Sequence, residues 1–314
     1  MFWDSIQSVM SLVLMMAVGF VMTKRPWFGK KGEDFLSKLC MQVGIPLMMV
    51  ENVYETCGTR EQLLYLLKYF PIPFAIITFF LIIGVILSKV LKVKPNRRGA
   101  FINVIGFSNT VFIGFPIVTA ILGEEALPTA MSYYIGNTVL FWTAGAWFLR
   151  RDHDPNTRIF TVENVKKMIS PPIKGFTVGI ILVLLDVELP AWIYNPIAQI
   201  GDTATPVAML VIGSILRNIN YKEIKMSADI AVLLLNRFII SPLIMLAVMM
   251  VLPLDNMAKQ VYLILIIMPA MTQFGILAKE TGADYEFCTV MIAVTTVASM
   301  IVIPFYTAIL GMVF

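Results

Sequence analysis

Apolar residues occur along the chain in long runs, and short polar segments separate one run from the next. A helix needs about 20 predominantly apolar residues to cross the ~30 Å hydrocarbon core of a bilayer, and these runs reach that length. They do not alternate apolar and polar positions at the period of two that membrane strands require. The pattern therefore predicts an all-α polytopic membrane protein with ten spans, at residues 5–23, 34–54, 63–88, 99–122, 127–149, 172–187, 193–216, 228–252, 258–279 and 285–312.

Composition agrees with this fold class and argues against several functions. Of the 314 residues, 58% are hydrophobic and only 14% are charged, whereas a soluble domain carries roughly a quarter charged residues. The three cysteines lie far apart without the spacing of metal ligands, and the only histidine, His153, falls in a polar segment. No nucleophile–base pair or set of metal ligands is visible inside the predicted spans. We therefore expect neither an enzyme nor a bound cofactor or metal.

The basic residues predict how the spans are oriented. Most of the 24 Lys and Arg residues fall in the odd-numbered loops, whereas the even-numbered loops contribute only Arg60 and Lys259. Because cytoplasmic loops carry the excess of basic residues, we predict that the odd-numbered loops are cytoplasmic and that both termini are extracytoplasmic. We expect the protein in the cell inner (plasma) membrane. The net charge of +4 follows from this orientation, so nothing indicates a nucleic-acid partner.

The two halves of the chain resemble each other weakly. GIPLMMVENV in the second span is similar to ATPVAMLVIG in the seventh, and LLKYFPIPF in the third span is similar to LLNRFIISPL in the eighth. The second match sets Lys68 opposite Arg237. We predict a five-helix repeat over residues 1–150, a cytoplasmic linker over 151–171 and a second repeat over 172–314. Because five is odd, the second repeat is inverted, and inverted repeats are typical of secondary transporters.

The stretch GFSNTVFIGFPIVTAILGEE interrupts the fourth span near its centre. It brings Asn109, Thr110 and Pro116 into a region where each open backbone group costs several kcal/mol unless protein or a water-filled cavity satisfies it. A helix that restarts there presents unpaired N–H groups and a partial positive charge, which attract a carboxylate. Pro116 suits the first turn of such a half-helix, because its missing donor does no harm there. We predict that all three residues bind substrate.

The ninth span carries a matching interruption, with Pro269, Thr272 and Gln273 close together. We predict that these residues complete the substrate site. The alternative is an ordinary proline kink whose freed backbone groups are satisfied by neighbouring Ser, Thr or Asn side chains. Matching interruptions in both halves favour a transport site near the middle of the membrane.

Four motifs carry a resemblance to a known family. They are NTVFIGFPIV at 109–118, IGNTVLFWTAGAWFLRR in the fifth span, IGDTATPVAMLVIG at 200–213 and MPAMTQFGILAKET at 268–281. Together they resemble the auxin efflux carrier family, which includes the plant PIN proteins and belongs to the bile acid–sodium symporter-like superfamily. The resemblance implies ten transmembrane helices in two inverted five-helix repeats, with broken helices four and nine that cross each other. It also implies a scaffold part and a transport part that move relative to each other.

The same resemblance implies a substrate class and an oligomeric state. The family carries small organic anions, which are indole-3-acetate in plants and malate- or malonate-like dicarboxylates among bacterial members. This chain lacks the long hydrophilic central loop of many plant members, which favours a dicarboxylate permease over an auxin exporter. The family also implies a homodimer.

Two further residues match family positions near the substrate. Lys68 matches a lysine of the third span that supports the carboxylate site, although the aspartate that accompanies it in plants is Leu64 here. Alternatively, the Lys68 side chain extends to the outer membrane interface. Asn137 matches a polar position beside the substrate, or else it forms an interhelical hydrogen bond. Both are predicted substrate-binding residues, with these alternatives open.

Two charged residues are predicted to serve coupling or gating. Arg237 lies deep in the eighth span, where we predict a structural or gating role, such as donating to the carbonyls of an interrupted helix, before contact with the ligand. Asp202 matches an aspartate of the seventh-span motif. Because a carboxylate inside a span should face a partner or a water-filled path, Asp202 could carry a coupling proton, pair with a lysine or cap a helix.

The sequence thus predicts a secondary transporter that moves a small organic carboxylate across the lipid bilayer by alternating access, through an elevator or rocking motion. A sodium-coupled symporter of the bile-acid type is the alternative, although no acidic residue lies at the ninth-span interruption to favour it. A channel would show repeated pore loops or rings of charge, which the sequence lacks. Coupling to a proton or to sodium stays open.

Overall fold

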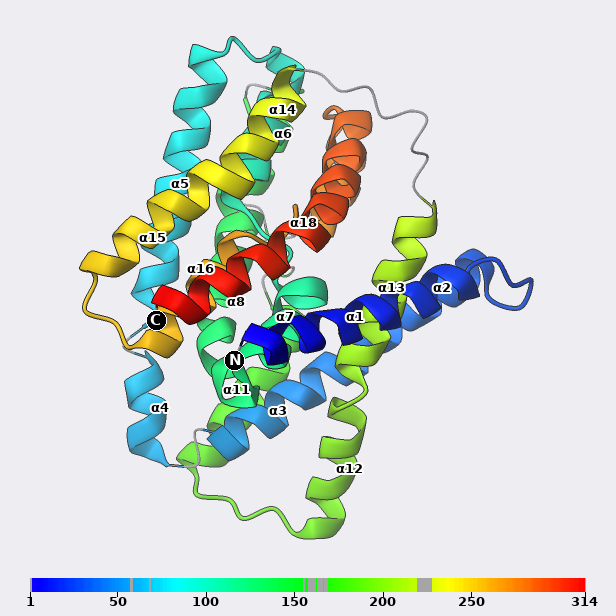
Figure 1. Ribbon diagram of the computed structural model, residues 1–314, viewed down its shortest axis with the longest axis vertical. Coiled ribbons are helices and arrows are strands. Elements are labelled where there is room, and N and C mark those ends of the chain that lie inside the picture. Colours follow the sequence, from blue (N-terminus) through cyan, green and yellow to red (C-terminus); the bar gives the residue numbers. More distant parts are fainter. Residues whose placement is uncertain are drawn as a thin grey trace. The chain divides into compact units, whose positions relative to one another are not determined.

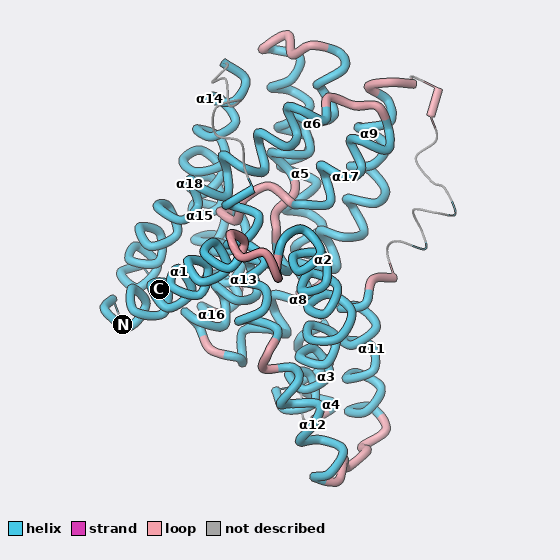
Figure 2. Tube along the Cα trace, turned by 90° about the vertical axis from the view of Figure 1, so that its right-hand side faces the viewer, coloured by secondary structure: helices cyan, strands magenta, loops and turns pink. Residues whose placement is uncertain are grey.

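A computed structural model of the chain describes residues 2–56, 59–67, 69–154, 156–157, 162, 166, 169–218 and 228–313. Within these residues the chain forms helices joined by turns and short loops, without a strand (Figure 2). Five helical segments are long and apolar enough to cross a membrane: Pro71–Val90, Pro95–Leu122, Ala191–Asn218, Ala228–Val251 and Tyr285–Tyr306. The fold is therefore that of an all-helical, multi-pass membrane protein. The ten spans and the inverted repeat stay predictions.

The helices group into two compact units, which we describe separately. Unit 1 comprises Met1–Phe70, Val111–Ser132 and Ile169–Ile219, and unit 2 comprises Pro71–Thr110, Tyr133–Met168 and Asn220–Phe314. Each unit takes segments from both halves of the chain. The two units are defined by contacts in space, whereas the predicted repeats, 1–150 and 172–314, are defined by similarity along the sequence. The repeats stay a prediction.

Unit 1 contains pairs of helices that approach each other closely. Its helices are α1 (Phe2–Met22), α2 (Gly29–Leu39), α3 (Ile45–Thr56), α4 (Arg60–Leu67), α7 (Phe115–Leu122), the first part of α8 (Leu127–Leu140), α11 (Pro171–Leu184), α12 (Ala191–Gly201) and α13 (Ala204–Asn218). Gly213 of α13 faces the carbonyl of Met16 in α1 so closely that a Cβ atom would collide with it. Gly175 of α11 stands in the same relation to Pro46 in α3. Such small residues let membrane helices pack backbone to backbone.

Unit 2 is arranged around α6 (Pro95–Gly106), whose residues from Gly99 to Gly106 are all buried. Its other elements are α5 (Pro71–Val90), the second part of α8, α9 (Ala146–Arg151), α14 (Ala228–Leu235), η6 (Asn236–Ile240), α15 (Ser241–Val251), α16 (Asn256–Ile266), α17 (Thr272–Thr281) and α18 (Tyr285–Val313). Contacts join α6 to α5, α14 and α18 (Figure 1) and to α9 and α17 (Figure 2). Because α6 is surrounded in this way, its carboxyl end lies inside the unit.

Two predicted spans are divided differently in the structure. The predicted span 63–88 consists of two helices, α4 and α5, and α5 begins at Pro71. Proline fits the first position of a helix, where its missing N–H is not needed, so the helix restarts there. The predicted span 193–216 is interrupted by a short turn after Gly201, so α12 and α13 are separate helices.

Two interruptions lie in the segments in which the sequence predicted them. After Gly106, the last residue of α6, the chain leaves the helix and resumes at Thr110 with a wide π-helical turn that leads into α7. α16 ends at Ile266, and α17 begins at Thr272. Both non-helical segments, from residue 107 to Asn109 and from residue 267 to 271, belong to unit 2.

Candidate functional site

The two interruptions meet inside unit 2. The backbone N–H of Asn109 donates a hydrogen bond to the carbonyl of Pro269, with nitrogen and oxygen 2.8 Å apart. Phe107 leads into this contact in an extended conformation, with φ −116° and ψ 144°. Asn109, Thr110 and Pro269 are all buried. Because these open backbone segments lie away from solvent, each N–H and C=O group needs a partner within the protein or from a bound molecule.

Asn137 of α8 supplies such partners to the first interruption. Its Oδ1 accepts the N–H of Ser108 at 3.2 Å, and its Nδ2 donates to the carbonyl of the same residue at 3.1 Å. The Asn137 side chain has no exposed surface. One buried amide thus satisfies both backbone groups of Ser108. This contact is the interhelical hydrogen bond that the sequence allowed, and a contact of Asn137 with substrate stays a prediction.

The second interruption is held by Thr295 of α18. The Thr295 hydroxyl oxygen accepts the N–H of Ala270 at 3.0 Å and donates to the carbonyl of Met291, in its own helix, at 2.6 Å. Thr295 is fully buried. A side chain from a neighbouring helix therefore stabilises each interruption.

Arg237 connects the two interruptions. It lies in the π-helical turn η6 and is only 2% exposed. Its Nε donates to the carbonyl of Met268 at 2.6 Å, and its Nη2 donates to the carbonyl of Pro269 at 3.3 Å. On the other interruption, Nη2 donates to Ser108 Oγ at 2.7 Å, and Nη1 donates to the carbonyl of Val104 in the last turn of α6. One guanidinium group therefore holds both interruptions together.

The charge of Arg237 is balanced by helix ends. Its four acceptors are neutral oxygens, and no carboxylate pairs with it among the residues that the structure describes. A buried ion without a counter-charge is costly. The carboxyl end of a helix, however, carries a partial charge equivalent to about −0.5. Because α6 and α16 both end beside the guanidinium, their two ends together offer about one negative charge.

The two helices that resume after the interruptions present the opposite charge. Their amino ends, at Thr110 and at Thr272, carry partial positive charge, and neither first turn contains an acidic residue. The Thr110 hydroxyl is buried and has no hydrogen-bond partner in the described part of the chain, and the same holds for Thr138 on α8. Because buried polar atoms are nearly always hydrogen-bonded, these hydroxyls indicate positions for water or a bound molecule.

The structure describes some of the remaining predicted substrate residues but not all of them. Pro116 is buried at the second position of α7, in the first turn as predicted, and a π-helical turn from Thr110 to Gly114 precedes this helix. Gln273 is half-buried in the first turn of α17. For Thr272 the structure describes the backbone but not the side chain, and Lys68 lies outside the described residues. Their substrate-binding roles stay predictions.

Asp202 belongs to unit 1. It follows the last residue of α12, and its side chain is exposed. In the same unit, Glu51 lies within electrostatic reach of Asp202, Glu55 and Glu124. Asp202 is thus part of a group of carboxylates, and its role in coupling or gating stays a prediction.

Three residues at the interruptions were missed by sequence reasoning. Ser108 lies inside the polar stretch of the fourth span but was not singled out. Tyr133 is wholly buried on α8, and its hydroxyl lies within electrostatic reach of Arg237. Its position four residues before Asn137, on the same face of the helix, was a usable signal. Thr295 gave no local signal, because it lies 25 residues along the chain from its partner Ala270.

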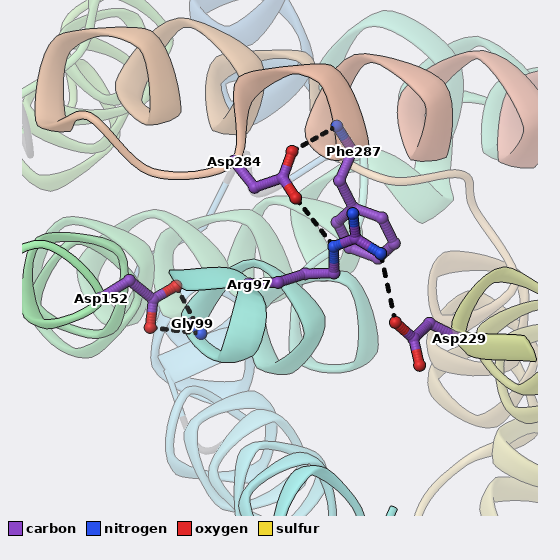
Figure 3. A network of polar contacts seen from close by, with 6 residues as sticks. All are labelled: Arg97, Gly99, Asp152, Asp229, Asp284 and Phe287. Carbon is purple, nitrogen blue, oxygen red and sulfur yellow. Dashed lines mark hydrogen bonds and ion pairs between the residues drawn. The ribbon is translucent and has the colours of Figure 1, made fainter. Parts of the chain in front are cut away.

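The amino end of α6 carries a second polar network (Figure 3). Arg97 Nε donates to Asp284 at 2.8 Å, and Nη1 donates to Asp229 at 3.2 Å. The guanidinium also lies over the ring of Phe287, 4.5 Å from its centroid. Asp284 in turn accepts the N–H of Phe287 at 3.0 Å. The network therefore joins α6, α14 and the start of α18.

Asp152, which follows α9, binds the same end of α6. Its two carboxylate oxygens accept the N–H of Gly99 at 2.9 and 2.8 Å (Figure 3). Burial raises the pKa of the Asp152 carboxyl from 3.8 to about 6; the nearby Asp284 adds to this, whereas the N–H donors and Arg98 oppose it. Asp152 lies in the predicted central loop, outside the spans.

The chain is similar to known transport proteins along nearly its whole length. The family model described as "Membrane transport protein" matches residues 4–156 and 150–307, which include both interruptions. An uncharacterized transporter of Methanothermobacter thermautotrophicus is 23% identical over 320 residues, which are 98% of this chain and 99% of that protein. An uncharacterized transporter of Methanocaldococcus jannaschii is 23% identical over 287 residues, which are 89% of this chain and 91% of that protein.

Proposed function

Because the chain belongs to the membrane transport protein family, the auxin efflux carrier family that its motifs resemble, we propose that this transporter is a secondary carrier of small organic anions. The proposed substrate is a malate- or malonate-like dicarboxylate or an auxin-like carboxylate. It would bind at the two interruptions and cross the membrane by alternating access.

The separation of charge at the interruptions is the observation that supports an anionic substrate. Arg237 occupies the negative, carboxyl ends of α6 and α16. The positive, amino ends at Thr110 and Thr272 are left without an acidic residue in their first turns. Each such end carries about +0.5 charge, which suits a carboxylate group. Cations would gain nothing at these ends.

Four of the predicted binding residues, all in unit 2, support this proposal. Thr110 offers a buried hydroxyl, and Asn109 and Pro269 form the backbone contact between the interruptions. Gln273 adds an amide in the first turn of α17. We propose that Asn137 acts mainly by fixing the backbone of the first interruption, so that the positive helix end at Thr110 keeps its position.

Several further features belong to this proposal. We propose that the chain crosses the cell inner (plasma) membrane ten times and has both termini on the extracytoplasmic side. We also propose that it transports by an elevator or rocking motion and forms a homodimer. Lys68 would support the carboxylate site, and Asp202 would carry a coupling proton. Uptake driven by a pH gradient tests the last point. We expect Asp202→Asn to abolish the dependence on the gradient, and an unchanged dependence would remove Asp202 from that role.

A thermal-shift screen of purified protein tests the proposed function. Mono- and dicarboxylates are compared with their uncharged amides, in wild type and in Asn109→Ala, Thr110→Val and Lys68→Ala. We expect at least one carboxylate to raise the melting temperature of the wild type, its amide to have no effect, and the three variants to respond less.

Thr143→Val provides a matched control for Thr110→Val. The Thr143 hydroxyl is bonded to the carbonyl of Val139 within its own helical segment, so its loss should leave the carboxylate response intact. If the response survives unchanged in all three site variants, the assignment of the site is wrong. If no carboxylate stabilises the wild type, the proposed substrate class is wrong.

A further inference from the structure

The environment of Arg237 resembles a cation site more than an ion pair. Its donors contact three backbone carbonyls, of Val104, Met268 and Pro269, and one hydroxyl, of Ser108. These oxygens come from both interruptions and converge on one buried group. Converging neutral oxygens of this kind are ligands that hard cations prefer. Unwound carbonyls and carboxyl ends of broken helices also coordinate Na⁺ in many secondary transporters.

The local backbone explains how a side chain reaches this position. Arg237 lies in a π-helical turn between buried Asn236 and Phe238, whereas Leu235 and Ile239, each two residues away, are 48% and 49% exposed. π-turns inside α-helices often mark functional positions. The guanidinium is enclosed by unit 2 and donates to four oxygens, one of which, the carbonyl of Pro269, also accepts the N–H of Asn109.

We propose that Arg237 is a tethered cation that permanently fills an oxygen-lined cation site at the two interruptions. A free Na⁺ cannot enter this position while the guanidinium occupies it. This inference rests on the proposed function, and it means that the carboxylate is transported without Na⁺ bound at the position of the Arg237 guanidinium. A sodium-coupled mechanism that placed Na⁺ on these carbonyls would need them to be free of the guanidinium.

The proposal predicts that a free cation can replace the tethered one. Arg237→Ala removes the guanidinium but keeps all four oxygens, three of which belong to the backbone. We expect a small cation to bind the vacated site, with free guanidinium the best fit because it keeps the planar fork of donors. Binding to the folded state raises the melting temperature in proportion to the logarithm of cation concentration above the dissociation constant.

The test is thermal unfolding of purified protein in choline chloride, without any carboxylate. Millimolar guanidinium, Na⁺ or K⁺ is added to the wild type, to Arg237→Ala and to Arg97→Ala, the last being a control arginine that contacts carboxylates. We expect Arg237→Ala to melt several degrees below wild type and to regain part of that loss with guanidinium. Wild type and Arg97→Ala should show no such gain.

Two outcomes would overturn the tethered cation. One is an Arg237→Ala protein that responds to cations no more than Arg97→Ala does. The other is a rise in the melting temperature of the wild type with millimolar Na⁺, accompanied by the same rise in Arg237→Lys, because Na⁺ would then bind although a tethered cation is present. If Arg237→Ala does not fold, Arg237→Lys keeps the test valid, because it retains a cation and should fold with no response to Na⁺. Since no carboxylate is present, failure here is distinct from failure of carboxylate binding.

Discussion

Two arginines at opposite ends of α6 are held in contrasting ways. Arg97, in the first turn, is 22% exposed in its side chain and contacts two carboxylates and an aromatic ring. Arg237 meets the last turn from another helix, is nearly completely buried, and contacts only neutral oxygens. Both belong to unit 2. The more deeply buried charge is thus the one without a carboxylate partner in the described residues.

The direction of the helix dipole explains this difference. A cation in the first turn faces the positive end of α6, so Arg97 requires carboxylates nearby to be tolerated. A cation at the carboxyl end faces the negative end, and Arg237 meets the carboxyl ends of two helices at once. Helix ends can therefore take the place of a counter-ion, and they do so at the point where the chain is interrupted.

Replacing Arg237 should produce the largest effect. Arg237→Met removes the guanidinium donor from the buried carbonyls of Val104 and Met268, whereas the carbonyl of Pro269 keeps the N–H of Asn109. Each orphaned group costs about 1–3 kcal/mol, so we expect a loss of about 2 kcal/mol or more in the free energy of unfolding, measured in detergent. A loss below about 1 kcal/mol would mean that the helix ends do not depend on this guanidinium.

Asn137→Ala should have the next largest effect. This variant removes the two hydrogen bonds between the Asn137 side chain and the Ser108 backbone. Because single polar contacts between membrane helices are modest, we expect a loss of about 1–2 kcal/mol in the free energy of unfolding. Carboxylate affinity should fall as well, since the first interruption loses its support. Asn195→Ala, at an exposed position of α12, is the control and should change neither quantity.

Arg97→Met should lower the free energy of unfolding less than Arg237→Met does, although it breaks two ion pairs. Partly exposed pairs are each worth about 1 kcal/mol or less, and salt weakens them. We therefore expect a loss of about 1 kcal/mol that shrinks as NaCl is raised, whereas the loss from Arg237→Met should not depend on salt. Equal costs for the two variants, with equal salt dependence, would refute the contrast between the two sites.

Asp152 should produce the smallest effect, and one that depends on pH. Its pKa is raised by burial from 3.8 to about 6, so the folded state holds a proton more tightly than the unfolded state. The contribution of Asp152 to stability is then complete below about pH 4 and declines as pH rises to about 6. We expect Asp152→Asn to remove this decline from the melting temperature measured across that range. Asp154→Asn, at an exposed neighbouring position, should leave the decline in place; if it removes the decline instead, Asp152 is not responsible.

The sequence predicted the positions of the interruptions better than the contacts made there. Asn109 and Pro269 could be found because polar and helix-breaking residues inside apolar runs are a local signal. Donation from Arg237 to the carbonyls of an interrupted helix was also predicted and is observed, but the particular residues could not be named, since they lie on segments more than 30 residues away and depend on how α6 and α16 pack. Pro116 lies in the first turn of α7, as predicted, but nothing in the local sequence indicates the π-helical turn from Thr110 to Gly114 that precedes it.

The second polar network was also beyond local signals. Arg97 was counted only as part of the basic, cytoplasmic loops, yet Asp229 and Asp284 reach it from distant segments. Nor does similarity between the halves of the chain reveal the two units, because each unit combines helices from both halves. Pairwise contacts across long separations decide both features.

Uptake into proteoliposomes in sodium-free buffer tests the central claim most directly. The carboxylate that stabilises the purified protein most is supplied outside, with choline as the only added cation, and empty liposomes give the background. We predict saturable uptake that added Na⁺ leaves unchanged, because Arg237 already fills the cation position and the free helix ends bind the anion. Uptake that occurs only when Na⁺ is present would contradict this.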